Sequence, residues 1–73
     1  MRYIIKTSGL MCGHCDASVE TELLKVPGVH EADADHESQA VEVEADAEGL
    51  EEALAAAVAA AGDKFRALSV EIA

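Results

Sequence analysis

The chain has 73 residues, of which 51% are hydrophobic, and its only aromatic residues are Tyr3 and Phe65. This length suits one compact domain and leaves little room for a large catalytic cleft. The formal net charge of -10 argues against a nucleic-acid partner, because phosphate binding relies on clusters of Lys and Arg that this chain lacks.

The apolar segments are too short to cross a membrane. The longest apolar run, Ala53–Ala61, falls well below the ~20 residues that a spanning helix needs. The first six residues lack the apolar core of a signal sequence, so we expect a cytoplasmic protein without membrane insertion. In a reducing cytosol, two cysteines in so short a chain favour a metal or redox pair over a structural disulfide.

The first half of the chain predicts a strand, a helix and a second strand. β-forming residues dominate Arg2–Thr7. Apolar residues near helical spacing predict a helix over His14–Lys25, which Pro27 ends. Alternation of alanines with acidic residues predicts a second strand over Val29–Asp35.

The second half predicts two more strands around a second helix. Valines and glutamates alternate over Val41–Glu44, which is typical of a strand with one buried face. Helical spacing of apolar residues predicts a helix over Glu48–Ala61, and Phe65–Ile72 is rich in β-formers. The order βαββαβ predicts an α+β ferredoxin-like sandwich, a four-stranded antiparallel sheet with two helices on one face, as a single domain over residues 1–73.

Two cysteines three residues apart, Cys12 and Cys15, stand where a loop leads into the first helix. Backbone N–H groups at a helix N-terminus favour thiolates, and Gly13 lets the backbone fold so that both sulfurs converge on one ion. Two thiolates satisfy a low-coordinate soft ion such as Cu(I), whereas structural zinc wants four ligands. An exposed two-coordinate ion is open to thiolates of another protein, so this site favours transfer over storage.

A C-x-x-C pair has two other interpretations. The first is a dithiol oxidoreductase and the second is an inert pair of surface thiols. The redox interpretation is disfavoured because no Trp precedes the pair and Pro27 lies beyond the first helix. We therefore expect a metal carrier and not an enzyme.

Two motifs at the expected separation resemble the heavy-metal-associated domain family, which includes bacterial copper chaperones and N-terminal domains of metal-pumping P-type ATPases. The first is G-x-x-C-x-x-C, from Gly9 to Cys15. The second is the pattern L-x-x-A-hydrophobic-x-x-A-G, matched by Leu54, Ala57, Val58, Ala61 and Gly62. The resemblance spans nearly the whole chain. It implies that Cys12 and Cys15 are the metal ligands and that the metal is delivered to a P-type ATPase domain of the same fold.

This sequence departs from the family pattern at two places. Leu10 stands where the family usually has a Met beneath the metal loop, and Met11 follows it; this exchange conserves volume, so we expect the loop to be kept and Met11 to be partly exposed. Asp63 stands where copper-handling relatives commonly have Tyr or Lys. Its charge would oppose a Cu(I) dithiolate but could supply an oxygen ligand to Zn(II). Alternatively, Lys64 balances the charge while Phe65 packs in the core.

The metal and the assembly state stay open at this point. A carrier of Zn(II), Cd(II) or Hg(II) is the alternative to a Cu(I) chaperone, and His14, between the cysteines, is a candidate third ligand that we expect to project outward. His30 and His36 have no partners at metal-binding spacing and are expected at the surface. Both a monomer and a dimer bridged by a shared metal fit the sequence.

Overall fold

The computed structural model describes residues 1–11, 13–62 and 64–73. The elements, in chain order, are β1 (Arg2–Ser8), α1 (Gly13–Leu24), β2 (Val29–Asp35), β3 (Ala40–Ala45), α2 (Glu51–Ala60) and β4 (Arg66–Ile72). Each lies within a few residues of the range that the sequence predicts.

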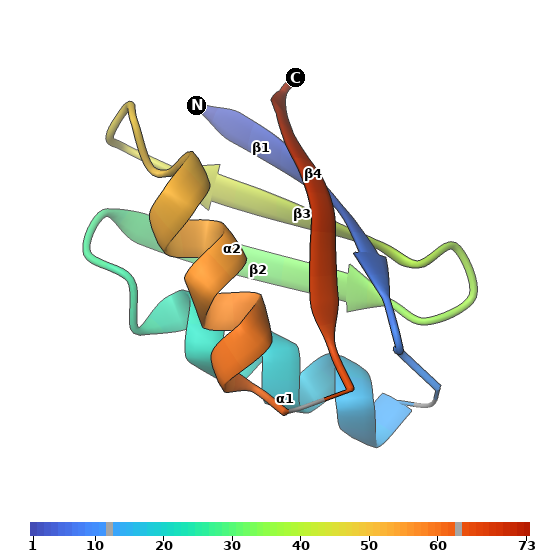
Figure 1. The fold of residues 1–73 in the computed structure, drawn as a ribbon. Helices are drawn as coiled ribbons and strands as arrows, with labels where there is room; N and C mark the ends of the chain where they lie inside the picture. Colours follow the sequence, from blue (N-terminus) through green and yellow to red (C-terminus); the bar gives the residue numbers. More distant parts are fainter. Residues whose placement is uncertain (12, 63) are drawn as a thin grey trace.

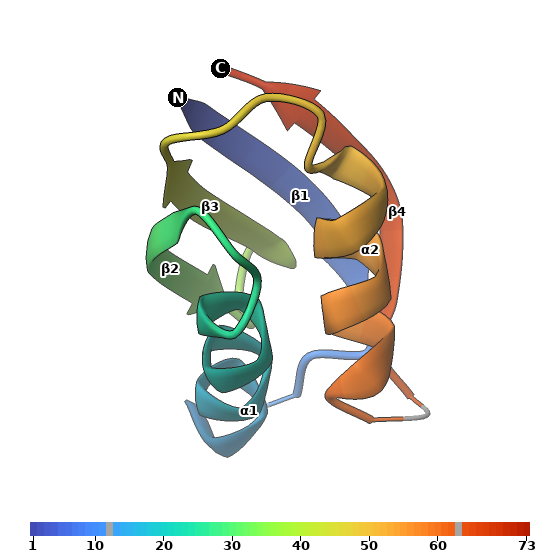
Figure 2. The same cartoon turned by 90° about the vertical axis from the view of Figure 1, so that its left-hand side faces the viewer.

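The strands form one antiparallel sheet in the order β2-β3-β1-β4. Both helices pack on the same face of this sheet, so the molecule has two layers (Figures 1 and 2). This arrangement confirms the predicted ferredoxin-like sandwich. It also brings the loop after β1, the turn between β2 and β3 and the connection from α2 to β4 to one end of the molecule (Figure 1).

The core fills the space between the sheet and the helices with aliphatic side chains and one tyrosine. Alternate residues of β1 and β3 point into it, while their neighbours are exposed or only half-buried, because side chains of a strand alternate between its two faces. Tyr3 is fully buried, as predicted, and its hydroxyl donates a hydrogen bond to the Ala47 carbonyl at 2.9 Å. The largest fully buried side chains are Tyr3, Ile5, Leu23, Leu54, Val19, Val41, Val43 and Val58.

The second helix begins three residues later than the predicted start at Glu48. Gly49 has a φ of +75°, a left-handed conformation that a helix cannot contain, and Leu50 is the N-cap. The first bond of the helix runs from the Leu54 N–H to the Leu50 carbonyl at 2.8 Å. Glu48 therefore lies outside the helix, while Glu51 occupies its first turn.

The last strand begins at Arg66 and not at Phe65 as predicted. The Phe65 N–H donates to the Gly62 carbonyl at 3.2 Å, which closes a turn and keeps Phe65 out of the sheet. Its ring is half-buried against the core and covers Gly62, where an added Cβ would stand 3.1 Å from the ring. Phe65 therefore packs against the core only half-buried, and it does so from the turn before β4 and not from the strand as expected.

Neither helix approaches the length of a membrane-spanning segment. The helices α1 and α2 contain 12 and 10 residues, and nowhere in the described part of the chain is a helix long and apolar enough to cross a bilayer.

Candidate metal centre

The loop between β1 and α1 carries the cysteine motif, and its first residues alternate between the core and the solvent. Leu10 is 2% exposed and belongs to the core, whereas Met11 is 76% exposed. Leu10 therefore fills the place that the family usually gives to Met, and Met11 is exposed, both as predicted. Burial of Leu10 anchors the loop because removing this side chain would open a cavity in the core.

Gly9 permits a close approach between this loop and the connection from α2 to β4. Its φ is +98°, which L side chains rarely adopt. A Cβ added here would stand 2.0 Å from the Lys64 carbonyl oxygen. The first glycine of the motif is therefore required for two reasons, its backbone conformation and the lack of space for any side chain.

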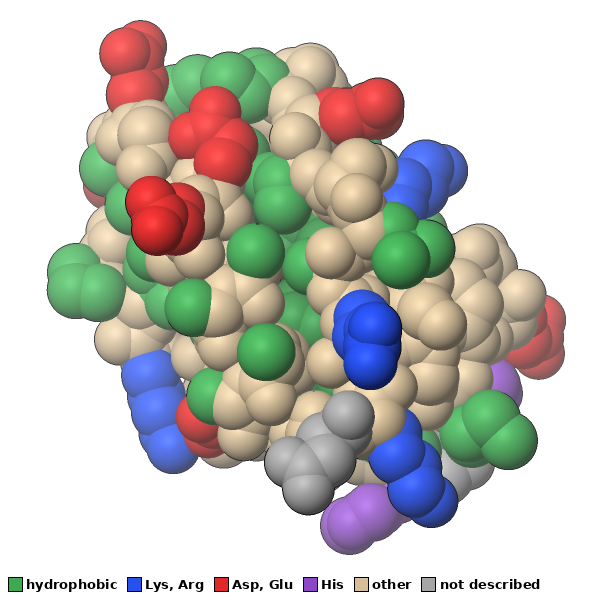
Figure 3. All heavy atoms as spheres, in the orientation of Figure 1, with side chains coloured by type: hydrophobic (Ala, Val, Ile, Leu, Met, Phe, Trp, Pro, Cys, Tyr) green, Lys and Arg blue, Asp and Glu red, His purple; other side chains and the backbone are tan. Residues whose placement is uncertain are grey.

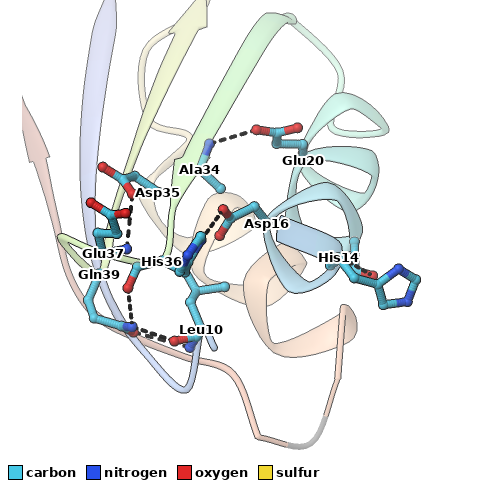
Figure 4. Close-up of polar contacts among 10 residues, drawn as sticks. Leu10, His14, Asp16, Glu20, Ala34, Asp35, His36, Glu37 and Gln39 are labelled. Atoms are coloured by element: carbon cyan, nitrogen blue, oxygen red, sulfur yellow. Dashed lines mark hydrogen bonds and ion pairs between the residues drawn. The ribbon is translucent and has the colours of Figure 1, made fainter. Parts of the chain in front are cut away.

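The turn between β2 and β3 (residues 36–39) also contacts the cysteine loop. The Gln39 side chain accepts a hydrogen bond from the Leu10 N–H at 3.1 Å and donates one back to the Leu10 carbonyl (Figure 4). Its amide nitrogen also donates to the His36 carbonyl at 2.7 Å, and the Gln39 carbonyl accepts from the Thr7 N–H at 2.7 Å. One residue of this turn thus holds the backbone on both sides of Gly9.

A second contact from the same turn reaches the start of α1. His36 Nδ1 lies 2.7 Å from Asp16 Oδ2, and the Asp16 side chain is only 14% exposed (Figure 4). The hydrogen bond that His36 donates to Asp16 raises the pKa of His36 above its ordinary value. His36 was expected at the surface without a partner at metal-binding spacing; β2 carries it to Asp16 of α1, a neighbour that sequence spacing does not reveal, and its side chain is only partly exposed.

Of the two cysteines of the motif, Cys15 lies in the described part of the structure. Cys12 and Asp63 lie outside the described residues. Cys15 lies in the first turn of α1 and is half-buried against the core. The second cysteine of the motif therefore sits at the helix start where the sequence predicts it.

The remaining histidines lie at the surface. The His14 side chain points away from α1 into solvent and away from His36 (Figure 4). His30 is exposed in β2, and its Nε2 lies 2.5 Å from Asp46 Oδ2, a neighbour that the sequence did not indicate. No group of three or more His, Cys, Asp or Glu side chains positioned to hold a metal ion occurs within residues 1–11, 13–62 and 64–73.

Several solved structures are similar to this chain over nearly its whole length. CopZ metallochaperone is 28% identical, with 93% of this chain and 100% of that one aligned and a TM-score of 0.82. The copper-binding domain of HMA7, a P-type ATPase, is 28% identical over 100% of this chain and 95% of its own, with a TM-score of 0.77. The N-terminal domain of PacS from Synechocystis PCC6803 is 25% identical over 94% of this chain and 96% of its own, with a TM-score of 0.79.

The sequence also matches a family model. A search of curated proteins found no match, but the model of the heavy-metal-associated domain matches residues 4–64, which include both motifs. The chain therefore belongs to the heavy-metal-associated domain family, whose membership supports heavy-metal binding and transfer as its class of function.

Proposed function

We propose that residues 1–73 act as one cytoplasmic metallochaperone domain that binds Cu(I) between the Cys12 and Cys15 thiolates and passes it to a P-type ATPase domain. The metal is cargo, and the protein performs no catalysis on it. The observation that carries the proposal is the G-x-x-C-x-x-C motif at the start of α1, in a chain that aligns along 93% of its length with CopZ metallochaperone. Two thiolates suit the low coordination number of Cu(I).

The exposure of the loop supports transfer. Met11 is 76% exposed, and Gly13 and His14 are exposed as well. An incoming thiolate can therefore approach this segment without unfolding any part of the sandwich. Transfer would proceed by ligand exchange, in which a partner thiolate binds the ion before a thiolate of this chain leaves.

The charge distribution fits a thiolate site at this end of the molecule. Two thiolates and one Cu(I) carry a net charge of about -1, which nearby cations stabilise. Exposed Lys64 and Arg66 flank the start of β4, and the Lys64 backbone contacts Gly9. In Figure 3 acidic side chains gather at the upper left of the face, around the start of α2, while Lys and Arg side chains lie at its centre, at its lower edge and at its upper right. The exposure of Lys64 and the contact of its backbone with Gly9 support Lys64 as the residue that balances the charge.

A competition titration of the reduced protein against a chromophoric Cu(I) chelator tests the binding site. Replacing either cysteine, in Cys12→Ser or Cys15→Ser, should weaken Cu(I) binding at least about 100-fold, more than the loss of an outer-shell partner causes. Met11→Leu and His14→Ala are the matched controls in the same loop, and both should bind as the parent does. Cysteine variants with parental affinity would refute the thiolate site.

Four further measurements address the alternative functions, the delivery partner and the assembly state. Competition between Cu(I) and Zn(II) ranks the metals, and preference for Zn(II) would replace the copper assignment with the divalent carrier. Reduction of insulin disulfides by the protein would support the dithiol oxidoreductase instead. Mixing Cu(I)-loaded protein with a separately prepared P-type ATPase metal-binding domain tests delivery, and size-exclusion chromatography with and without Cu(I) separates a monomer from a metal-bridged dimer.

A further inference from the structure

The contact between Gln39 and Leu10 extends the sheet beyond its last paired residues. The β1–β3 pairing ends at Lys6 and Ala40, and the Thr7 N–H bond to the Gln39 carbonyl adds one more step. Gln39 then turns its side-chain amide toward the backbone of Leu10 and forms the donor and acceptor pair that a strand residue would form. A side chain thus replaces backbone at the point where the chain leaves the sheet for the cysteine motif.

The backbone conformation of Gln39 is unfavourable for a glutamine, which indicates that its side-chain contact matters at this position. Its φ is +54°, and among non-glycine residues it alone has a positive φ in the described part of the chain. Gly or Asn would adopt this conformation more readily, since Gln has no special tolerance for it. Gln differs from Asn by one methylene, which is the length that lets the amide reach Leu10. The strained conformation is consistent with a residue retained for its contact.

The same turn holds both ends of the motif. Gln39 holds Leu10, two residues before Cys12, and His36 holds Asp16, the residue directly after Cys15 (Figure 4). Leu10 and Asp16 are both largely buried. Between these held ends, Met11 and His14 are exposed. The loop is therefore fixed where it enters and leaves and accessible in its middle.

We propose that Gln39 is a positioning residue for the metal site, a role that rests on the proposed function. By fixing both backbone polar groups of Leu10, it restricts the path by which the chain enters the C-x-x-C segment and lowers the entropy that the loop loses when two thiolates converge on one ion. Gln39 does not touch the metal and acts only through Leu10.

Gln39→Asn tests this role because it keeps the amide group and favours the left-handed backbone but cannot reach Leu10. We expect an unchanged or slightly higher urea midpoint for the metal-free protein, faster hydrogen exchange at the Leu10 amide, and Cu(I) binding about tenfold weaker, the lower range for loss of an outer-shell partner. Ser38→Ala is the matched control, since Ser38 is an exposed neighbour in the same turn, and all three quantities should stay parental.

Each outcome of this experiment decides something. Parental Leu10 exchange and parental Cu(I) affinity in Gln39→Asn would overturn the positioning role while leaving the thiolate site intact. Lower stability with unchanged affinity of the folded protein would assign Gln39 a structural role only, and would also overturn it. If the variant does not fold, hydrogen exchange of the parent protein tests the role instead. A Leu10 amide of the parent that exchanges as fast as an amide of an unfolded chain would overturn the positioning role. A parent that binds no Cu(I) overturns the proposed function and this inference together.

Discussion

Replacing Gly9 by alanine should destabilise the metal-free protein by about 2–5 kcal/mol. A left-handed backbone costs an L-residue about 1–2 kcal/mol. The new Cβ would also lie 2.0 Å from the Lys64 carbonyl oxygen and 2.8 Å from its carbonyl carbon, well inside the 3.4 Å at which ordinary contact begins. Both atoms belong to the backbone and cannot rotate away, so overpacking adds roughly 1–3 kcal/mol.

A loss of this size is large for so small a domain. At about 0.05–0.15 kcal/mol per residue, a chain of 73 residues has a total stability of roughly 4–11 kcal/mol. Each kcal/mol shifts the melting temperature of a domain of this size by about 4–8 °C, so Gly9→Ala should melt at least about 8 °C below the parent. Urea denaturation of the reduced, metal-free protein measures the free energy directly.

Gly13→Ala is the matched control because Gly13 belongs to the same motif. A Cβ at Gly13 meets no atom within 4 Å, and the residue begins α1 without a positive φ. Its stability should stay within about 0.5 kcal/mol of the parent or rise, since alanine favours the helix. A Gly9→Ala variant as stable as Gly13→Ala would refute the close packing of the loop against the connection to β4.

Three further predictions concern the residues around this loop. The hydrogen bond to Asp16 raises the pKa of His36 above 6.5, so the stability that this pair adds should be complete below pH 6.5 and lost as the pH rises through the raised value. In urea melts, the loss of unfolding free energy caused by His36→Gln should therefore be smaller at pH 9 than at pH 5.5. If this loss keeps the same pH dependence in an Asp16→Asn background, the pairing is contradicted. Tyr3→Phe removes the bond to the Ala47 carbonyl and should lower the free energy of unfolding by about 1 kcal/mol, whereas an unchanged urea midpoint would mean that the bond adds no net stability. Leu10→Ala should cost about 2–5 kcal/mol and Leu10→Met less than about 1.5 kcal/mol in the same assay, because only the first leaves a cavity; equal losses would contradict the burial of this side chain.

The sequence was sufficient for the fold because the decisive patterns are local. Alternation of valine and glutamate predicted β3, and the spacing of Leu54, Ala57 and Val58 predicted the buried face of α2. The boundaries of the helices and strands depended on the backbone conformation of single residues, which the amino-acid composition does not reveal. The start of α2 was placed too early because the left-handed conformation of Gly49 was not anticipated, although a glycine just before an apolar run was a usable signal.

The contacts around the cysteine loop were beyond sequence reasoning because they join distant residues. Gln39 and Leu10 are separated by 29 positions, and His36 and Asp16 by 20. Neither pair has a spacing typical of any motif, and a glutamine in a polar turn is indistinguishable from a solvated one. By contrast, the burial of Leu10 and the exposure of Met11 were predictable, since the family pattern fixes which of them faces the core.

These contacts explain how the cysteine loop can be exposed to solvent and still keep a fixed backbone conformation. A loop that lies open to a partner's thiolate has few neighbours to hold it, so its shape must be set from its ends. In this chain three contacts from two segments do so: the Lys64 backbone against Gly9, and, from the turn between β2 and β3, Gln39 against Leu10 and His36 against Asp16. Because none of these contacts involves the exposed middle of the loop, a partner can bind there without breaking them. Under the proposed function, the metal would therefore be exchanged at a site whose framework stays fixed during transfer.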